Sequence, residues 1–76
     1  MTLKNKNKIM DLIKRAESFT QKVPAESEVK TYLENASALN GIVKMLENIL
    51  GDEKFLETQE CTNFISSAEE QILSII

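Results

Sequence analysis

The sequence predicts an all-α fold, an elongated antiparallel three-helix bundle that runs up, down and up with a long middle helix. The expected helices cover about residues 4–23, 25–50 and 53–75. Apolar residues recur at alternating steps of three and four along each segment, which is helical spacing. Helix breakers stand between the segments, at Pro24 and Gly51. The register that aligns the three repeats demands turns at those same two places.

The first helix rests on one apolar repeat with steps of 3, 4, 3 and 4. The repeat consists of Ile9, Leu12, Ala16, Phe19 and Val23. Such spacing places all five side chains on one face, which can pack against neighbouring helices.

The middle helix contains Asn40-Gly41, a dipeptide that is typical of turns. A turn there would reset the phase of the apolar repeat, and the phase is not reset. The repeat continues through Val29, Tyr32, Ala36, Leu39, Val43, Leu46 and Leu50. We therefore expect the helix to run through Gly41, at a cost of about 1 kcal/mol relative to alanine. Residues 25–50 would form a rod of roughly 39 Å.

The third helix follows Asp52, a residue type that caps helix N-termini. Its repeat is Cys61, Ile65, Ala68, Ile72 and Ile75. Two features leave its continuity open. Phe55-Leu56 is out of phase with the repeat, and Ser66-Ser67 followed by Glu69-Glu70 offers capping boxes that could restart the helix.

Folding the helices at the two turns predicts which side chains share a layer. From one end to the other, the layers are Val23 with Val29 and Ile75, Phe19 with Tyr32 and Ile72, Ala16 with Ala36 and Ala68, Leu12 with Leu39 and Ile65, and Ile9 with Val43 and Cys61. Three alanines at one level allow close helix approach, and the aromatic layer beside them fills a wider section.

The whole chain, residues 1–76, is expected to be a single domain. Its 42% apolar content supports a real core. With Cys61 as its only cysteine and no histidine, it has no internal disulfide and no expected metal site. Stability must then come from helix packing, from self-association, or from both.

The composition also argues against catalysis. Without histidine there is no histidine base and no Ser-His or Cys-His nucleophile. Only two glycines are present, so no glycine-rich phosphate loop exists, and the acidic residues are scattered over solvent positions. Cys61 falls on the apolar repeat, where it acts as a small buried hydrophobe. We expect no enzyme activity, no cofactor and no small-molecule substrate.

Charge is unevenly distributed along the chain. Residues 1–23 carry six basic and two acidic side chains, a net charge of +4, whereas residues 24–76 carry three basic and ten acidic ones, a net charge of −7. A basic first helix can pair with acidic neighbours in its own bundle or with an acidic partner. Nucleic-acid binding is one alternative, through Lys4, Lys8, Arg15 and Lys22. The acidic pI near 4.9 and the lack of an aromatic platform on the basic helix disfavour it.

Apolar residues beyond the needs of one core indicate protein binding. The middle helix carries a second stripe, Ala38, Ile42, Met45 and Ile49, and Met10, Leu56 and Leu73 are also surplus. The terminal "ILSII" points apolar side chains in several directions, and extended apolar patches usually mark interfaces. The predicted partner-binding residues are Ile42, Met45, Ile49, Leu73 and Ile76. The competing interpretation is that neighbouring helices cover these residues inside the bundle.

The sequence thus predicts a small non-enzymatic helical module that binds a partner protein or a second copy of itself. Adaptors, chaperone-like proteins and inhibitors or regulators all fit this description. The alternative is a nucleic-acid-associated regulator that uses the basic first helix. No apolar run reaches the length of a membrane span and no signal-like segment opens the sequence, so we expect a cytoplasmic protein, in its own cell or in a host's.

Overall fold

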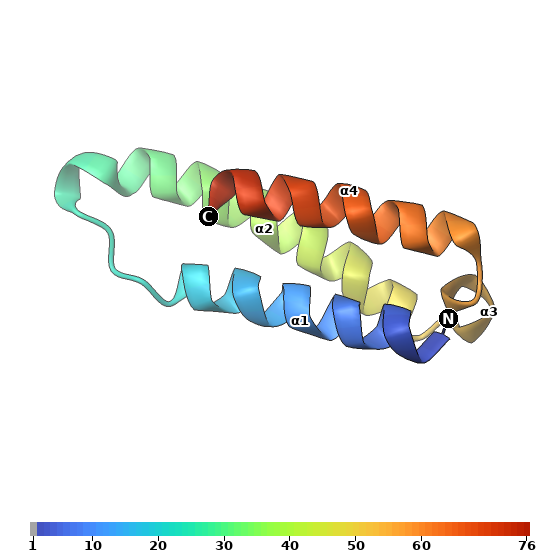
Figure 1. Ribbon diagram of the computed structural model, residues 1–76. Helices are drawn as coiled ribbons and strands as arrows, with labels where there is room; N and C mark the ends of the chain where they lie inside the picture. The colour runs from blue at the N-terminus through green and yellow to red at the C-terminus, as the bar shows by residue number, and fades with distance from the viewer. Residues whose placement is uncertain (1) are drawn as a thin grey trace.

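A computed structural model describes residues 2–76. It is all-helical, as the sequence predicts, and no described residue lies in a strand. Its elements are α1 (Thr2–Thr20), the 3-10 turn η1 (Glu26–Glu28), α2 (Val29–Leu50), α3 (Glu53–Leu56) and α4 (Gln59–Ile75). The molecule is elongated, with extents of 44 × 17 × 15 Å, and α1, α2 and α4 lie lengthwise beside one another (Figure 1). Within the described residues, no helix combines the length and apolar character needed to cross a membrane.

Helix α2 runs without interruption through Asn40 and Gly41, which confirms the prediction made from the unbroken repeat. Gly41 has no positive φ, and a Cβ added there would meet nothing within 4 Å. The backbone therefore does not use the freedom that a turn glycine has. Helix α4 likewise continues through Ser66, so the capping boxes there do not restart the helix.

The connection between the first two helices is longer than predicted. Helix α1 ends at Thr20 instead of residue 23, and α2 begins at Val29 after η1 instead of at residue 25. Pro24 explains part of this difference, because a proline disfavours helical backbone at the residue before it. Val23 consequently sits in the loop with 93% of its surface exposed. With Val29 also exposed, the predicted layer of Val23, Val29 and Ile75 does not form.

The predicted third helix, residues 53–75, is two helices. Asp52 does act as an N-cap, but of the short α3, where its side chain accepts a hydrogen bond from the Phe55 N–H at 3.2 Å. The chain then turns, and Thr58 caps α4 by accepting from the Cys61 N–H at 3.2 Å. Leu56 lies just before this break. The sequence predicts it to be a surplus apolar residue, whereas in the structure it is fully buried.

The core follows the predicted repeats along most of the length of α1 and α4. Its buried apolar side chains are Ile9, Leu12, Ala16, Leu39, Leu46, Leu56, Cys61, Ile65, Ala68 and Ile72. Phe19 and Tyr32 stack with ring centroids 5.5 Å apart, as their shared layer predicts. The Tyr32 hydroxyl also donates to the Thr20 carbonyl at 2.7 Å, which ties the end of α1 to α2.

Asn5 is the one buried polar residue of the described chain, and the sequence analysis did not identify it. Its Nδ2 donates to the Leu56 carbonyl at 2.8 Å and lies 3.4 Å from the Thr62 hydroxyl. These bonds join α1 to α3 and α4 at one end of the molecule. A buried amide needs such partners, because each unmet hydrogen bond in an apolar site is costly.

The two ends of the molecule differ. At one end, α3 lies across the ends of the other helices (Figure 1). Leu56, the last residue of α3, is fully buried. At the other end, the first turns of α2 extend beyond the last turn of α4, and the loop 21–25 leads away from α1 (Figure 1). We call this second region the open end: the C-terminal half of α1, the loop, η1, the start of α2 and residues 73–76.

Candidate functional site

The apolar stripe predicted on the middle helix is mostly used by the molecule itself. Ile42 and Ile49 are half-buried and pack against the core. Of the predicted binding residues on α2, Met45 alone is exposed, at 49%. Packing within the chain therefore accounts for two of the three residues, which is the competing interpretation that the sequence left open.

Leu73 and Ile76, the two predicted binding residues near the C-terminus, are each 51% exposed. They line a cavity of about 360 Å³ together with Lys14, Arg15 and Ser18 of α1. Met45 lies in the half of α2 nearer to α3, so it does not share this surface (Figure 1). The structure thus divides the five predicted residues between the core, one isolated methionine and a site between α1 and α4.

The predicted nucleic-acid residues do not form one uncommitted basic patch. Lys8 pairs with Glu69 of α4, and Arg15 pairs with Asp11 on its own helix at 3.1 Å. Lys22 lies in the loop, away from Lys4 near the start of α1. The Lys8–Glu69 pair is the complementary pairing between helices that the charge distribution predicts.

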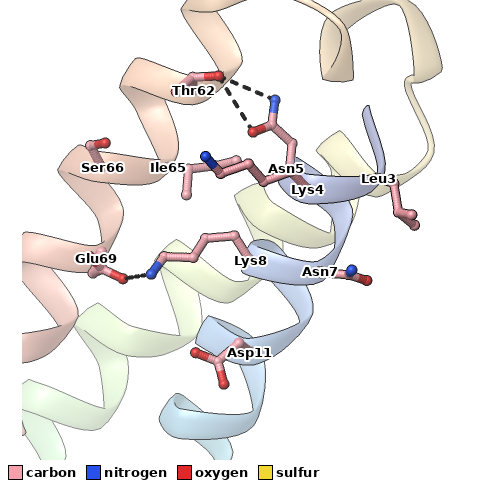
Figure 2. A pocket seen from close by; sticks show the side chains of 10 residues that line it. All are labelled: Leu3, Lys4, Asn5, Asn7, Lys8, Asp11, Thr62, Ile65, Ser66 and Glu69. Atoms are coloured by element: carbon pink, nitrogen blue, oxygen red, sulfur yellow. Dashed lines mark hydrogen bonds and ion pairs between the residues drawn. The ribbon is translucent and has the colours of Figure 1, made fainter. Parts of the chain in front are cut away.

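A groove with a volume of about 810 Å³ lies between α1 and α4, towards the end of the molecule where α3 lies (Figure 2). Figure 2 shows Asn5 and Thr62 bonded to each other and Lys8 reaching Glu69, whereas Leu3 points away from α4. Among the described side chains, no buried nitrogen or oxygen lacks a hydrogen-bond partner. Four of the polar side chains in this groove are therefore already paired, Asn5 with Thr62 and Lys8 with Glu69.

Most of the exposed large apolar side chains belong instead to elements at the open end. Eight large apolar residues of the described chain are exposed, and five belong to this region. These five, hereafter the open-end cluster, are Val23, Val29, Leu33, Leu73 and Ile76. A further cavity of about 460 Å³ lies at the same end, between the loop and the first turns of α2, with Phe19 and Tyr32 in its wall.

Sequence reasoning found Leu73 and Ile76 but missed the other three members. Val23 and Val29 were assigned to a buried layer, and Leu33 was given no role. The available signals were Pro24, which shortens α1, and the out-of-phase Phe55-Leu56, which delays the start of α4. Together they leave the beginning of α2 with fewer neighbours than the register predicts.

Charges of opposite sign border the open-end cluster. Residues 14–22 carry three basic side chains and one acidic one, a net charge of +2, and residues 26–34 carry one basic and three acidic side chains, a net charge of −2. Lys14, Lys22, Glu28 and Glu34 are all exposed. Lys14 and Arg15 line the same cavity as Leu73 and Ile76. Lys22 and Glu28 line the same cavity as Val23.

The cysteine thiol does not lie at this surface. Cys61 is fully buried, and burial raises the pKa of its thiol from the ordinary value of 9.0. Throughout residues 2–76, no three histidine, cysteine, aspartate or glutamate side chains gather as metal ligands would. What this arrangement can do chemically is bury apolar surface and pair charges.

Comparison with protein-family models, with curated proteins and with solved structures finds no match to this chain. Inference about function therefore rests on the geometry of the open end.

Proposed function

We propose that this chain is a small, non-enzymatic helical module that binds a protein surface through its open end. The observation that carries the proposal is the concentration of exposed apolar side chains there, opposite an end that α3 closes. Exposed apolar side chains scattered singly are ordinary, but a gathered set usually marks an interaction site. As the scaffold, we propose the antiparallel three-helix bundle of α1, α2 and α4 that the apolar repeats predict.

The hydrophobic gain available from this surface is moderate. Fully burying one valine, leucine or isoleucine side chain contributes about 1.5–3 kcal/mol. The exposed parts of the five together amount to about three whole side chains, which supply about 4–9 kcal/mol in total. Association costs about 4–15 kcal/mol in lost freedom of motion. Apolar burial on this side of the interface thus only offsets the cost, and the partner must add contacts of its own. The flanking charges would select that partner.

Nucleic-acid binding, the alternative predicted from the sequence, has weaker support. Lys8 and Arg15 already have acidic partners within the chain. A complex held by phosphate contacts would weaken steeply with salt, so a mobility-shift titration at about 50 mM salt tests this alternative directly. Absence of a shifted band at that salt concentration removes it.

The protein-binding proposal is tested by capture from a lysate of the source cells, using the immobilised chain and three glutamate variants. Leu73→Glu places a charge in the open-end cluster. Ser67→Glu places the same charge at an exposed position of α4 outside the open end, and Met45→Glu tests the exposed methionine of α2. Far-UV circular dichroism first establishes that each variant is helical.

We expect a protein that is retained by the wild-type chain and by Ser67→Glu and lost with Leu73→Glu. Retention by Leu73→Glu at the wild-type level would contradict the proposal. Loss with Met45→Glu alone would place the binding surface on α2 and would also contradict an open-end site.

A further inference from the structure

We propose that the partner of the open end is a second copy of this chain, in a two-fold symmetric dimer. This inference rests on the proposed function and names the occupant of the same surface. It follows from two properties of the open end: its charges complement themselves, and its helices end at different levels.

The two chain segments that flank the open-end cluster carry opposite net charges. The basic flank is residues 14–22, with a net charge of +2, and the acidic flank is residues 26–34, with a net charge of −2. A two-fold axis makes each surface of one copy meet a reciprocal surface of the other. When the basic flank of one copy faces the acidic flank of its partner, the same attraction occurs twice. A partner of uniform charge would instead be repelled by one flank.

The existing ion pair on the basic flank does not prevent this pairing. Arg15 Nε lies 3.1 Å from Asp11 Oδ2 on the same helix, and both side chains are about half exposed. Exposed pairs at this spacing contribute only about 0.3–0.5 kcal/mol, so they rearrange at little cost. Lys14 and Lys22 form no ion pair within the described residues.

Helices α2 and α4 differ in length, so they do not reach the same level at the open end. The first turns of α2 extend beyond the last turn of α4, so that the two helix ends form a step (Figure 1). Leu33, in the first turns of α2, is 59% exposed, and Ile76, which follows α4, is 51% exposed. Two such steps can interlock, so that the projecting start of α2 in each copy covers the last turn of α4 in the other.

Both copies then bury their open-end clusters in one association event. The apolar contribution doubles, whereas the loss of translational and rotational freedom is incurred once. With a second copy as the partner, the free energy gained by burying both apolar surfaces can therefore exceed the cost of association.

The test is sedimentation equilibrium across about 1–500 µM, the range in which a moderate interface of this kind dissociates. The wild-type chain is expected to change from the 8.6 kDa monomer to a species of twice that mass. Leu73→Glu should remain monomeric, and Ser67→Glu should behave as the wild type.

A paired charge reversal tests the arrangement of the two flanks. One variant carries Lys14→Glu and Lys22→Glu, and the other carries Glu26→Lys and Glu28→Lys. Each variant alone places like charges at both contacts, so its dissociation constant should rise at least about tenfold. An equimolar mixture restores opposite charges at both contacts and should form a heterodimer. Lys44→Glu, which reverses an exposed lysine outside the open end, is the control and should leave dimerisation unchanged.

A monomer at every concentration would overturn the dimer, as would dimerisation of Leu73→Glu at the wild-type level. Failure of the mixture to associate would also overturn it. None of these results would affect the capture experiment, so a monomeric chain that still retains another protein through Leu73 would leave the proposed function standing.

Discussion

Replacing Leu56 with alanine tests whether α3 closes one end of the core. Leu56 is fully buried, and its carbonyl accepts the hydrogen bond from Asn5. Leucine-to-alanine changes at buried sites cost about 2–5 kcal/mol, from lost transfer energy and from the cavity left behind. A chain of this length has a total stability of about 4–11 kcal/mol. The substitution should therefore remove a large part of the free energy of unfolding.

The measurement is urea denaturation followed by far-UV circular dichroism, at a low micromolar concentration so that self-association does not contribute. With an m-value near 1 kcal/mol per molar urea, the midpoint should fall by about 2 M or more. Leu3→Ala is the matched control, because Leu3 is 70% exposed and lies outside the open end. Its effect should stay within about 0.5 kcal/mol.

One continuous helix over residues 53–75 and two separate helices predict different effects of Leu56→Ala on stability. If residues 53–75 formed one continuous helix, Leu56 would lie off the apolar repeat and its truncation would have little effect. A loss below about 0.5 kcal/mol for Leu56→Ala would refute the closing role of α3, since such values are typical of surface positions.

Three further predictions concern single residues. Asn5→Ala should lower stability by about 1–3 kcal/mol in the same assay, because it leaves the buried Leu56 carbonyl without its donor; an equal loss for the exposed Asn7→Ala would contradict this. Gly41→Ala should raise stability by about 0.5–1 kcal/mol, since its helical backbone suits alanine and the added Cβ meets nothing, and a lower melting temperature would count against a straight α2. The pKa of Cys61 is raised in the folded state, so the folded chain holds its proton more tightly and stability should fall as pH rises above 9.0. Cys61→Ala should remove that part of the alkaline loss, and an unchanged pH dependence would show that other groups cause it.

Local pattern was sufficient for the helical class of the fold and for most of the core. The phase of an apolar repeat is a property of neighbouring residues, so it showed that α2 continues through Gly41. The same logic correctly placed Leu12, Cys61 and Ile72 in the core. Even the cap at Asp52 was predictable, because an N-cap is made within one turn of chain.

The candidate site was predictable only in part. Leu73 and Ile76 were expected at a surface because they lie beside the apolar repeat of their helix, and they are half exposed. Ile42 and Ile49 lie beside a repeat in the same way, yet α2 packs them against the core. Periodicity shows which residues share a face, but the number of neighbours covering that face depends on helices distant in sequence.

Local sequence establishes that this protein is helical, that α2 continues through Gly41 and which residues can form a core, because helix formation and apolar phase are decided over a few residues. Tertiary structure decided how far each helix extends beside the others. The turn after Leu56 and the loop after Thr20 together determine where α4 and α2 begin along the length of α1. Those positions are fixed only when segments distant in sequence pack against one another. The difference in levels leaves Val29 and Leu33 at the surface.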